Sequence, residues 1–304
     1  MFLKKSSLSS MAKYETYTAW MFAGPAVILL LFFLVVPFFM SVGLAFTNQR
    51  LISPLPTEFV GLRNFVRLFG DRVFYKSIGN NFLFVIVVVP LQTALALLLA
   101  VLVDRTKRFS KLFRMVYFVP VVVPMIVVSV IWYFMYNPSI GLINKALSAI
   151  SFGTLGHSMW LQGQKTALPA IMILSIWQGV GFQMVIYLAG LQDVPQSLYE
   201  AATVDGASPF RTFWSITLPQ LRNTTIFIVV STTILAFQLF TQVKVMTDGG
   251  PNDATSTTVL YIYNQGFKSL KVGYAAAVSV IFILIVLSVS LFQRRYMHSN
   301  REVD

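Results

Sequence analysis

Long apolar runs separated by short polar stretches set the pattern of this chain. Six of them are long enough to cross a hydrocarbon core of about 30 Å as a helix, and Lys244 is the one charged residue inside them. They lie near 19–46, 79–103, 115–136, 166–192, 223–246 and 273–292. Because a spanning segment has to satisfy its backbone hydrogen bonds internally, the pattern predicts an all-α membrane protein with six transmembrane helices.

Shorter features refine this prediction. The stretch 59–77 predicts an interfacial amphipathic helix, and a short amphipathic piece lies near Ile143–Ile150. The apolar face of the first would hold Phe59, Leu62, Phe65, Val66 and Leu68. Pro25, Pro37, Pro90, Pro120 and Pro124 fall inside the spans. Since neighbouring helices can satisfy the carbonyls that a proline frees, we expect kinks at these positions rather than helix ends.

Composition and charge place the chain in a membrane and orient it. Only 11% of its residues are charged, against about 25% in a soluble domain. The net charge of +12 comes from Lys and Arg clusters between the apolar runs, which are typical of cytoplasmic loops rather than of nucleic-acid binding. The densest cluster, at 104–114, predicts that both termini are cytoplasmic. We therefore expect a retained cytoplasmic segment 1–18, a six-span domain 19–293 and a cytoplasmic tail 294–304.

The residue types that the spans lack argue against several classes of function. There is no cysteine, and the two histidines, His157 and His298, lie in a loop and in the tail, so no metal site or catalytic residue is predicted. The spans offer neither ion-coupling carboxylates nor a nucleophile–base pair, which argues against a proton-driven carrier and an intramembrane enzyme. A stand-alone carrier or channel for a small neutral solute remains the alternative. The chain also lacks a G-x-x-x-x-G-K-[ST] phosphate loop, so a partner must supply the energy for uphill transport.

The loop 193–222 is the sizeable cytoplasmic surface where such a partner could dock. Pro195 can start one short helix, and Asp205–Gly206 breaks it. Ser208 is a good N-cap, with Pro209 at the first position of a second helix that we expect to end at Pro219. The sequence therefore predicts a helix, a sharp turn and a second helix on the cytoplasmic side.

This loop also carries a recognisable motif. Glu-Ala-Ala, three residues, Gly, nine residues and Ile-x-Leu-Pro resemble the signature loop of permease subunits of ABC importers. The matching residues are Glu200, Ala201, Ala202, Gly206, Ile216, Leu218 and Pro219. Other segments resemble the carbohydrate-import branch, of the maltose and glycerol-phosphate type: FVGLRNF (59–65), NPSIGLIN (137–144), LYEAATVDGAS (198–208) and TDGGP (247–251). The resemblance covers nearly the whole chain.

The resemblance implies the type I ABC importer permease fold in a bacterial inner membrane. It makes the loop a coupling helix seated in a cleft of an ATPase subunit, with Glu200 meeting basic groups and Gly206 allowing the bend. The implied coupling residues are Glu200, Ala201, Ala202, Asp205, Gly206, Ser208 and Pro209. The implied partners are a second permease subunit, an ATPase dimer that binds ATP and Mg, a solute-binding protein outside, and membrane lipid. This chain itself would hold no cofactor.

The resemblance also implies a sugar site midway through the membrane. Matched by position, its wall would include Ser175, Gln178, Gly179, Phe182, Thr232, Ala236 and Leu239. Ala236 and Leu239 stand where the maltose member has amides, and Gln238 and Gln242 offer amides nearby. The neutral polar residues of the spans are equally consistent with contacts between helices. A phosphorylated or sulfonated ligand is a further alternative, which Arg63, Lys145 and Lys165 on the outer side would attract.

Overall fold

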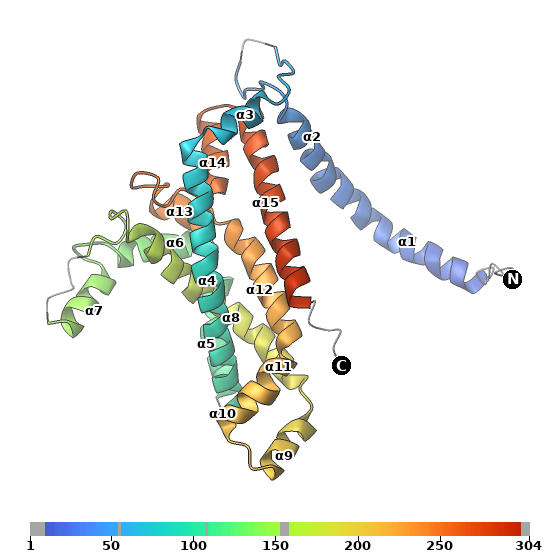
Figure 1. Cartoon of the computed structure of the whole chain (residues 1–304), viewed down its shortest axis with the longest axis vertical. Coiled ribbons are helices and arrows are strands. Elements are labelled where there is room, and N and C mark those ends of the chain that lie inside the picture. Colours follow the sequence, from blue (N-terminus) through green and yellow to red (C-terminus); the bar gives the residue numbers. More distant parts are fainter. Residues whose placement is uncertain (1–9, 54–55, 107–108, 153–157, 299–304) are drawn as a thin grey trace.

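A computed structural model describes residues 10–53, 56–106, 109–152 and 158–298. The described part is built from helices, joined by short loops and a single isolated β-bridge between Thr47 and Phe59. Its long helices run side by side, whereas the N-terminal helix points away from the rest (Figure 1). His157 and the first nine residues, with Lys4 and Lys5, lie outside the described residues.

The predicted spans are confirmed as apolar helices. Five long helices of the described chain could cross a membrane by length and composition, or six if a bent pair counts as one span. The long helices are α1–α2 (Ser10–Leu30 and Val36–Leu44, joined by the π turn Leu31–Val35), α4 (Arg72–Arg105), α8 (Ala167–Gln192), α12 (Arg222–Phe237) with α13 (Thr241–Met246), and α15 (Val272–His298). The last helix continues to His298, past the predicted end of the sixth span.

The third predicted span is not one straight or kinked helix. It consists of α5 (Ser110–Val122) and α6 (Met125–Met135), which meet at an angle of 96°. Pro124 has no N–H, and Val123 before it is extended (φ −74°, ψ 130°), as the ring of a following proline requires. Because Pro124 has no N–H, the Pro120 carbonyl cannot receive the bond that residue i+4 gives in a helix, and the amide of Gln178 donates to it instead over 3.4 Å. Pro25, Pro37 and Pro90 are held inside continuous helices.

The fifth predicted span is interrupted as well. Its helix α12 ends at Phe237, and α13 begins only at Thr241. The buried Asn81 of α4 donates to the Phe237 carbonyl over 3.0 Å, and Thr257 donates to the Leu239 carbonyl over 2.8 Å. These bonds satisfy backbone groups that the break would otherwise leave unpaired inside the protein.

The predicted amphipathic helix over 59–77 is too long. Only α3 (Arg63–Phe69) forms, and the stretch from Arg72 belongs to α4. Gly70 and Asp71 separate the two, because Asp71 is the N-cap of α4 and accepts from the N–H groups of Val73 and Phe74. The predicted apolar face is also split: Leu68 is fully buried, while Phe59, Leu62 and Val66 are exposed.

The remaining helices occupy the loops. The predicted amphipathic piece near Ile143–Ile150 is α7 (Leu142–Ile150), in the loop after α6. The loop after α13 contains α14 (Thr258–Tyr263) and the π turn Asn264–Lys268. The coupling loop contains α9 (Gln196–Val204), α10 (Pro209–Thr212), the π turn Phe213–Thr217 and α11 (Leu218–Gln220). In Figure 1 this loop lies at the end of the molecule opposite α3.

The packed centre is formed by α4, α8 and α12. Buried side chains of these helices make two apolar clusters, one around Phe237 and Ile171 and one around Tyr187 and Leu221. Helix α5 approaches α8 so closely that a Cβ at Gly181 would lie 2.6 Å from the carbonyl carbon of Tyr117. The arm α1–α2, in contrast, leaves its apolar side chains exposed.

Asp71 joins α4, α14 and α15 through hydrogen bonds. Besides capping α4, its carboxylate accepts hydrogen bonds from the hydroxyls of Tyr261 on α14 and Tyr274 on α15, the latter over 2.7 Å. Burial acts to raise the pKa of Asp71, but these bonds outweigh it and hold the pKa below its ordinary value. Its contribution to stability is therefore present above the ordinary carboxyl pKa and lost as pH falls through the lowered one.

We expect Asp71→Asn to lower the stability of the purified protein at neutral pH by about 1–3 kcal/mol, because the amide leaves a buried tyrosine hydroxyl with a weaker acceptor. Thermal unfolding in detergent measures this. Asp104→Asn, at an exposed position near the other end of α4, serves as the control and should be neutral. Equal melting temperatures for the two variants would contradict the role of Asp71.

Candidate functional site

A cavity of about 660 Å³ lies among α4, α5, α6, α8, α12 and the segment after the α12 break. All nine residues expected in a ligand wall line it. They are Ser175, Gln178, Gly179, Phe182, Thr232, Ala236, Gln238, Leu239 and Gln242. Thus the packing of two spans, α8 and α12–α13, brings residues that are distant in sequence to one space.

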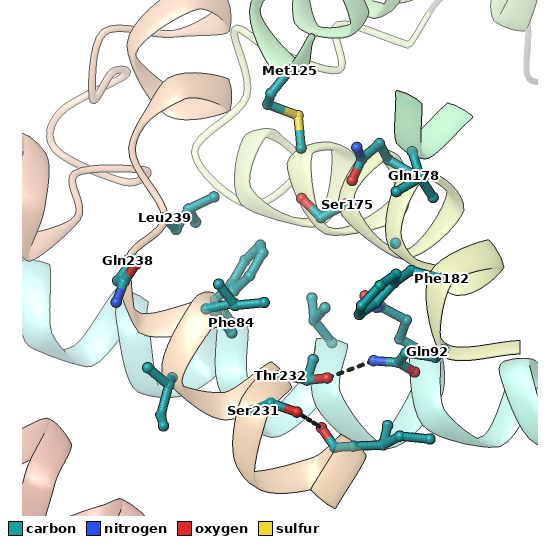
Figure 2. A pocket seen from close by; sticks show the side chains of 18 of the residues that line it. Phe84, Gln92, Met125, Ser175, Gln178, Phe182, Ser231, Thr232, Gln238 and Leu239 are labelled. Carbon is teal, nitrogen blue, oxygen red and sulfur yellow. Dashed lines mark hydrogen bonds between the residues drawn. The ribbon is translucent and has the colours of Figure 1, made fainter. Parts of the chain in front are cut away.

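Helix α8 supplies one wall. Ser175, Gln178, Gly179 and Phe182 share a face of this helix because they follow the spacing i, i+3, i+4 and i+7. Figure 2 shows this face turned towards the cavity, with Thr232 and Leu239 on the other side. A Cβ at Gly179 would lie 2.9 Å from the amide carbon of Gln92, so the glycine leaves room for that side chain to reach the cavity from α4.

The opposite wall comes from α12 and the break that follows it. Thr232 and the buried Ala236 belong to α12, while Gln238, Leu239 and Gln242 lie at and beyond its end. Residues on both sides of the break line the same cavity.

Hydrogen bonds join the two walls. Gln183 of α8 donates to the hydroxyl of Thr232 over 2.6 Å, and Gln242 donates weakly to Ser175 over 3.5 Å. The carbonyl oxygen of the Gln183 side chain is buried without a hydrogen-bond partner. A buried acceptor of this kind is costly unless something donates to it.

The chemistry of the cavity is neutral. The described residues that line it include no charged side chain; they are amides, hydroxyls, phenyl rings and aliphatic groups. Phe182 is half exposed towards the space, and Phe84 and Phe227 also line it. Amides and hydroxyls can donate to and accept from hydroxyl groups, and the ring faces can stack on an apolar face of a ligand.

Sequence reasoning missed several lining residues. On α4 these are Phe84, Val88 and Gln92, and the spacing i, i+4, i+8 is a signal that could have found them once Gln92 was noted. Gln183 and Ser231 are polar residues within spans whose burial or orientation the sequence does not give. Met125 reaches the cavity only because α6 turns away from α5 by 96°, which no local pattern specifies.

The loop after α8 forms the second candidate site. Glu200, Ala201, Asp205, Gly206, Ser208 and Pro209 are exposed, while Ala202 is buried. Gly206 has φ +69°, the left-handed region that favours glycine, and Ala207 N–H bonds back to the Ala202 carbonyl over 2.9 Å. Ser208 accepts from the Arg211 N–H over 3.3 Å as the N-cap of α10, with Pro209 first in that helix. The predicted helix, turn and second helix are confirmed.

The prediction that the second helix ends at Pro219 is wrong. The helix continues through a π turn at Phe213–Thr217 into α11, which includes Pro219 and ends at Gln220. A proline is tolerated here because it stands at the start of α11, directly after the widened turn. The hydroxyls of Tyr199 and Thr217, 3.2 Å apart, connect α9 to this helix, and Arg222 donates to the Met297 carbonyl over 2.9 Å. The loop is thereby attached to the last span.

Apolar spans, a neutral central cavity and an exposed two-helix loop define a membrane transport subunit. Residues 92–298 match the family described as binding-protein-dependent transport system inner membrane component. The chain belongs to this family of ABC importer permeases, and it is a transport permease, not an enzyme. Family membership decides against the stand-alone carrier or channel.

Individual relatives agree with this assignment. The chain is 36% identical to the probable ABC transporter permease protein YurN of Bacillus subtilis (strain 168), over 93% of this chain and 97% of that protein. It is 35% identical to the lactose transport system permease protein LacF of Rhizobium radiobacter, over 95% and 96%. In fold it is similar to a chain of a bacterial alginate ABC transporter in complex with an alginate pentasaccharide-bound periplasmic protein, with a TM-score of 0.82, 22% identity and coverage of 96% and 99%.

Proposed function

We propose that this permease forms, with a second permease subunit, the pathway by which a neutral sugar or sugar derivative crosses a bacterial inner membrane. The observation that carries the proposal is the uncharged cavity, in which amides and hydroxyls alternate with aromatic rings. A neutral polyhydroxylated ligand matches these groups. A phosphorylated or sulfonated one would bring a charge that no described lining residue balances.

The names of relatives support a carbohydrate. LacF is a lactose transport permease, and a structural neighbour belongs to a bacterial ABC transporter involved in the import of the acidic polysaccharide alginate. Relatives from Yersinia are permeases for sn-glycerol-3-phosphate, at 35% identity over 80% of this chain, so the family also includes an anionic substrate. The neutral lining of this cavity separates the proposed substrate from that one.

A second permease is part of the proposal because the cavity has an open side. Phe227 and Leu235 of α12 line it and yet are more than half exposed. Lipid on this side would leave the polar groups of the cavity without hydrogen-bond partners, so we infer a protein neighbour that closes the space. The exposed arm α1–α2 offers further apolar surface for that neighbour.

The proposed energy source is an ATPase dimer that binds ATP and Mg and contacts the coupling loop from the cytoplasm. The exposed Glu200, Asp205 and Ser208 offer acceptors to basic groups, while the rigid Gly206 turn fixes the angle between the two helices. Both termini are then cytoplasmic as well. A loaded solute-binding protein docks at the other end, on loops 137–165 and 247–272.

The cavity is tested by Gln178→Ala and Gln242→Ala in the complex reconstituted with its ATPase and binding protein. Each change should weaken uptake of the sugar by about five- to tenfold at limiting concentration, the value of one or two lost hydrogen bonds, without raising basal ATP hydrolysis. Gln192→Ala, at the exposed end of α8 and away from the cavity, is the matched control. Normal uptake in both cavity variants would remove these residues from the pathway.

A further inference from the structure

A second cavity, of about 440 Å³, is lined by residues of α3 and of the segments next to α2 and α15. In Figure 1, α3 lies at the end of the molecule opposite the coupling loop. The lining of this second cavity differs from that of the central cavity because it is strongly basic. Arg50, Arg63, Arg67 and Lys271 all line it, together with Asn64 and Tyr274. The transport pathway proposed above makes no use of it.

The four cations have no acidic partner of their own. The two ion pairs of the described chain join Asp248 to Lys244 and to Lys268, and neither involves this cavity. Neither Asp71 nor Glu58 forms an ion pair with these cations in the described chain: the Asp71 carboxylate accepts from the Tyr274 hydroxyl and from the start of α4, and the Glu58 carboxylate accepts from the Asn48 side chain over 3.5 Å. Like charges gathered without counter-charges repel one another, so an anion in the cavity would be bound favourably.

The walls of the cavity are fixed by hydrogen bonds. The Asn64 amide donates to the carbonyls of Ala45 and Thr47, each over 2.8 Å. The N–H of Gly273 donates to the Gln49 carbonyl over 2.9 Å, and the N–H of Leu51 to the Leu270 carbonyl over 3.0 Å. Arg67 also lies 4.9 Å above the ring of Tyr274. These hydrogen bonds hold together the backbone segments that carry the basic groups, next to α2, α3 and α15.

The surroundings indicate what kind of anion reaches this cavity. Arg50 follows the end of the spanning arm α1–α2, and Lys271 directly precedes the spanning helix α15, so the cavity lies where two spans leave the hydrocarbon core. Apolar residues that neighbour the cations in sequence form what we call its rim: Leu51 and Ile52 follow Arg50, and Leu62 and Val66 lie on either side of Arg63, all more than half exposed. Apolar side chains that reach into acyl chains beside cations at headgroup depth are the arrangement of an interfacial lipid site.

We propose that the cavity of Arg50, Arg63, Arg67 and Lys271 binds the phosphate of an anionic phospholipid. The guanidinium groups can bond phosphate oxygens in pairs, and Lys271 adds a point charge. An acidic protein surface would meet the same cations but would not match the exposed apolar rim. The proposal rests on the spans alone and holds whatever sugar the permease carries and whichever side of the membrane this end faces.

The test uses the detergent-purified complex of this chain with its partner subunits and a titration with dioleoylphosphatidylglycerol, followed by native mass spectrometry. The wild-type complex should retain this lipid in preference to dioleoylphosphatidylcholine. The double variant Arg63→Gln, Lys271→Gln should retain phosphatidylglycerol about 25-fold more weakly. Each charge near a lipid headgroup contributes about fivefold in affinity, and two charges are removed. Arg72→Gln, an exposed arginine at the same end that does not line the cavity, should change this retention less than twofold. Lys271→Arg should retain the lipid.

Four results would overturn the proposal. Equal retention by the double variant and by Arg72→Gln would remove the cavity from lipid binding. Equal retention of phosphatidylcholine would remove the anion preference, and displacement of phosphatidylglycerol by millimolar inorganic phosphate would make the ligand a free anion. Loss of binding-protein affinity in the double variant, with lipid retention intact, would assign the cations to that protein instead. Since the titration contains neither sugar nor ATP, its failure is distinct from failure of the transport proposal.

Discussion

Replacing Glu200 by lysine together with Gly206 by proline is expected to abolish ATP-driven uptake while the chain still inserts into the membrane. Proline fixes φ near −65°, whereas Gly206 has φ +69° and donates its N–H to the Thr203 carbonyl over 3.1 Å. The turn between α9 and α10 therefore cannot form. Lysine at position 200 also reverses an exposed charge that we propose meets basic groups of the ATPase.

The measurement is uptake and substrate-stimulated ATP hydrolysis in reconstituted vesicles, with insertion followed by protease accessibility. Gln220→Lys is the control, since it adds a charge at an exposed position of the same loop but lies beyond the turn. Both altered residues are exposed, and a Cβ at Gly206 would meet no atom within 4 Å, so folding of the spans should be spared. Wild-type uptake in the double variant would rule out the coupling role.

The coupling loop was largely predictable because its signals are local. Ser208 and Pro209 specify a helix start through groups within three residues, and Gly206 supplies a backbone conformation that other residues rarely adopt. The one wrong prediction there, a helix end at Pro219, has a local cause too. The π turn before Pro219 widens the helix, and no local sequence pattern predicts such a turn.

The spans were predictable as elements but not as shapes. Apolar length identifies them, yet the same proline chemistry gives continuous helices at Pro25 and Pro90 and a 96° bend at Pro124. At the bend, the amide of Gln178 in α8 donates to the Pro120 carbonyl, to which Pro124 has no N–H to donate. Asn81 plays the same part at the α12 break. Gln178 and Asn81 are distant in sequence from the carbonyls that they contact, so the sequence alone does not identify them as partners.

The nine residues expected in the wall line one cavity from α8, from α12 and from the segment after its break, because motif position and the helical period carry this information. The rest of the cavity depends on tertiary geometry. Met125 lines it through the bend at Pro124, and Gln92 through the space that Gly179 leaves. That the nine residues share one cavity is a property of the fold; that they contact a sugar remains a proposal.

Gly181→Ala is expected to have the second large effect, through the packing that builds the cavity. A Cβ at Gly181 would overlap the carbonyl of Tyr117 and lie 3.2 Å from the Cα of Phe118, and these backbone atoms cannot rotate away. Helix α5 would have to move off α8, and with it the bend that carries Met125 to the cavity. We expect a loss of about 1–3 kcal/mol of stability and strongly reduced uptake.

Gly179→Ala, half a turn away on the same helix, is the matched control. Its Cβ would meet only the end of the flexible Gln92 side chain, which can swing aside, so the melting temperature in detergent should hardly change. Uptake should still fall, because the displaced amide and the added methyl group occupy the cavity. Gly181→Ala should thus lower both stability and uptake, and Gly179→Ala only uptake. A Gly181→Ala variant as stable as the wild type would show that α5 can adjust, and that the close contact between α5 and α8 does not determine the shape of the cavity.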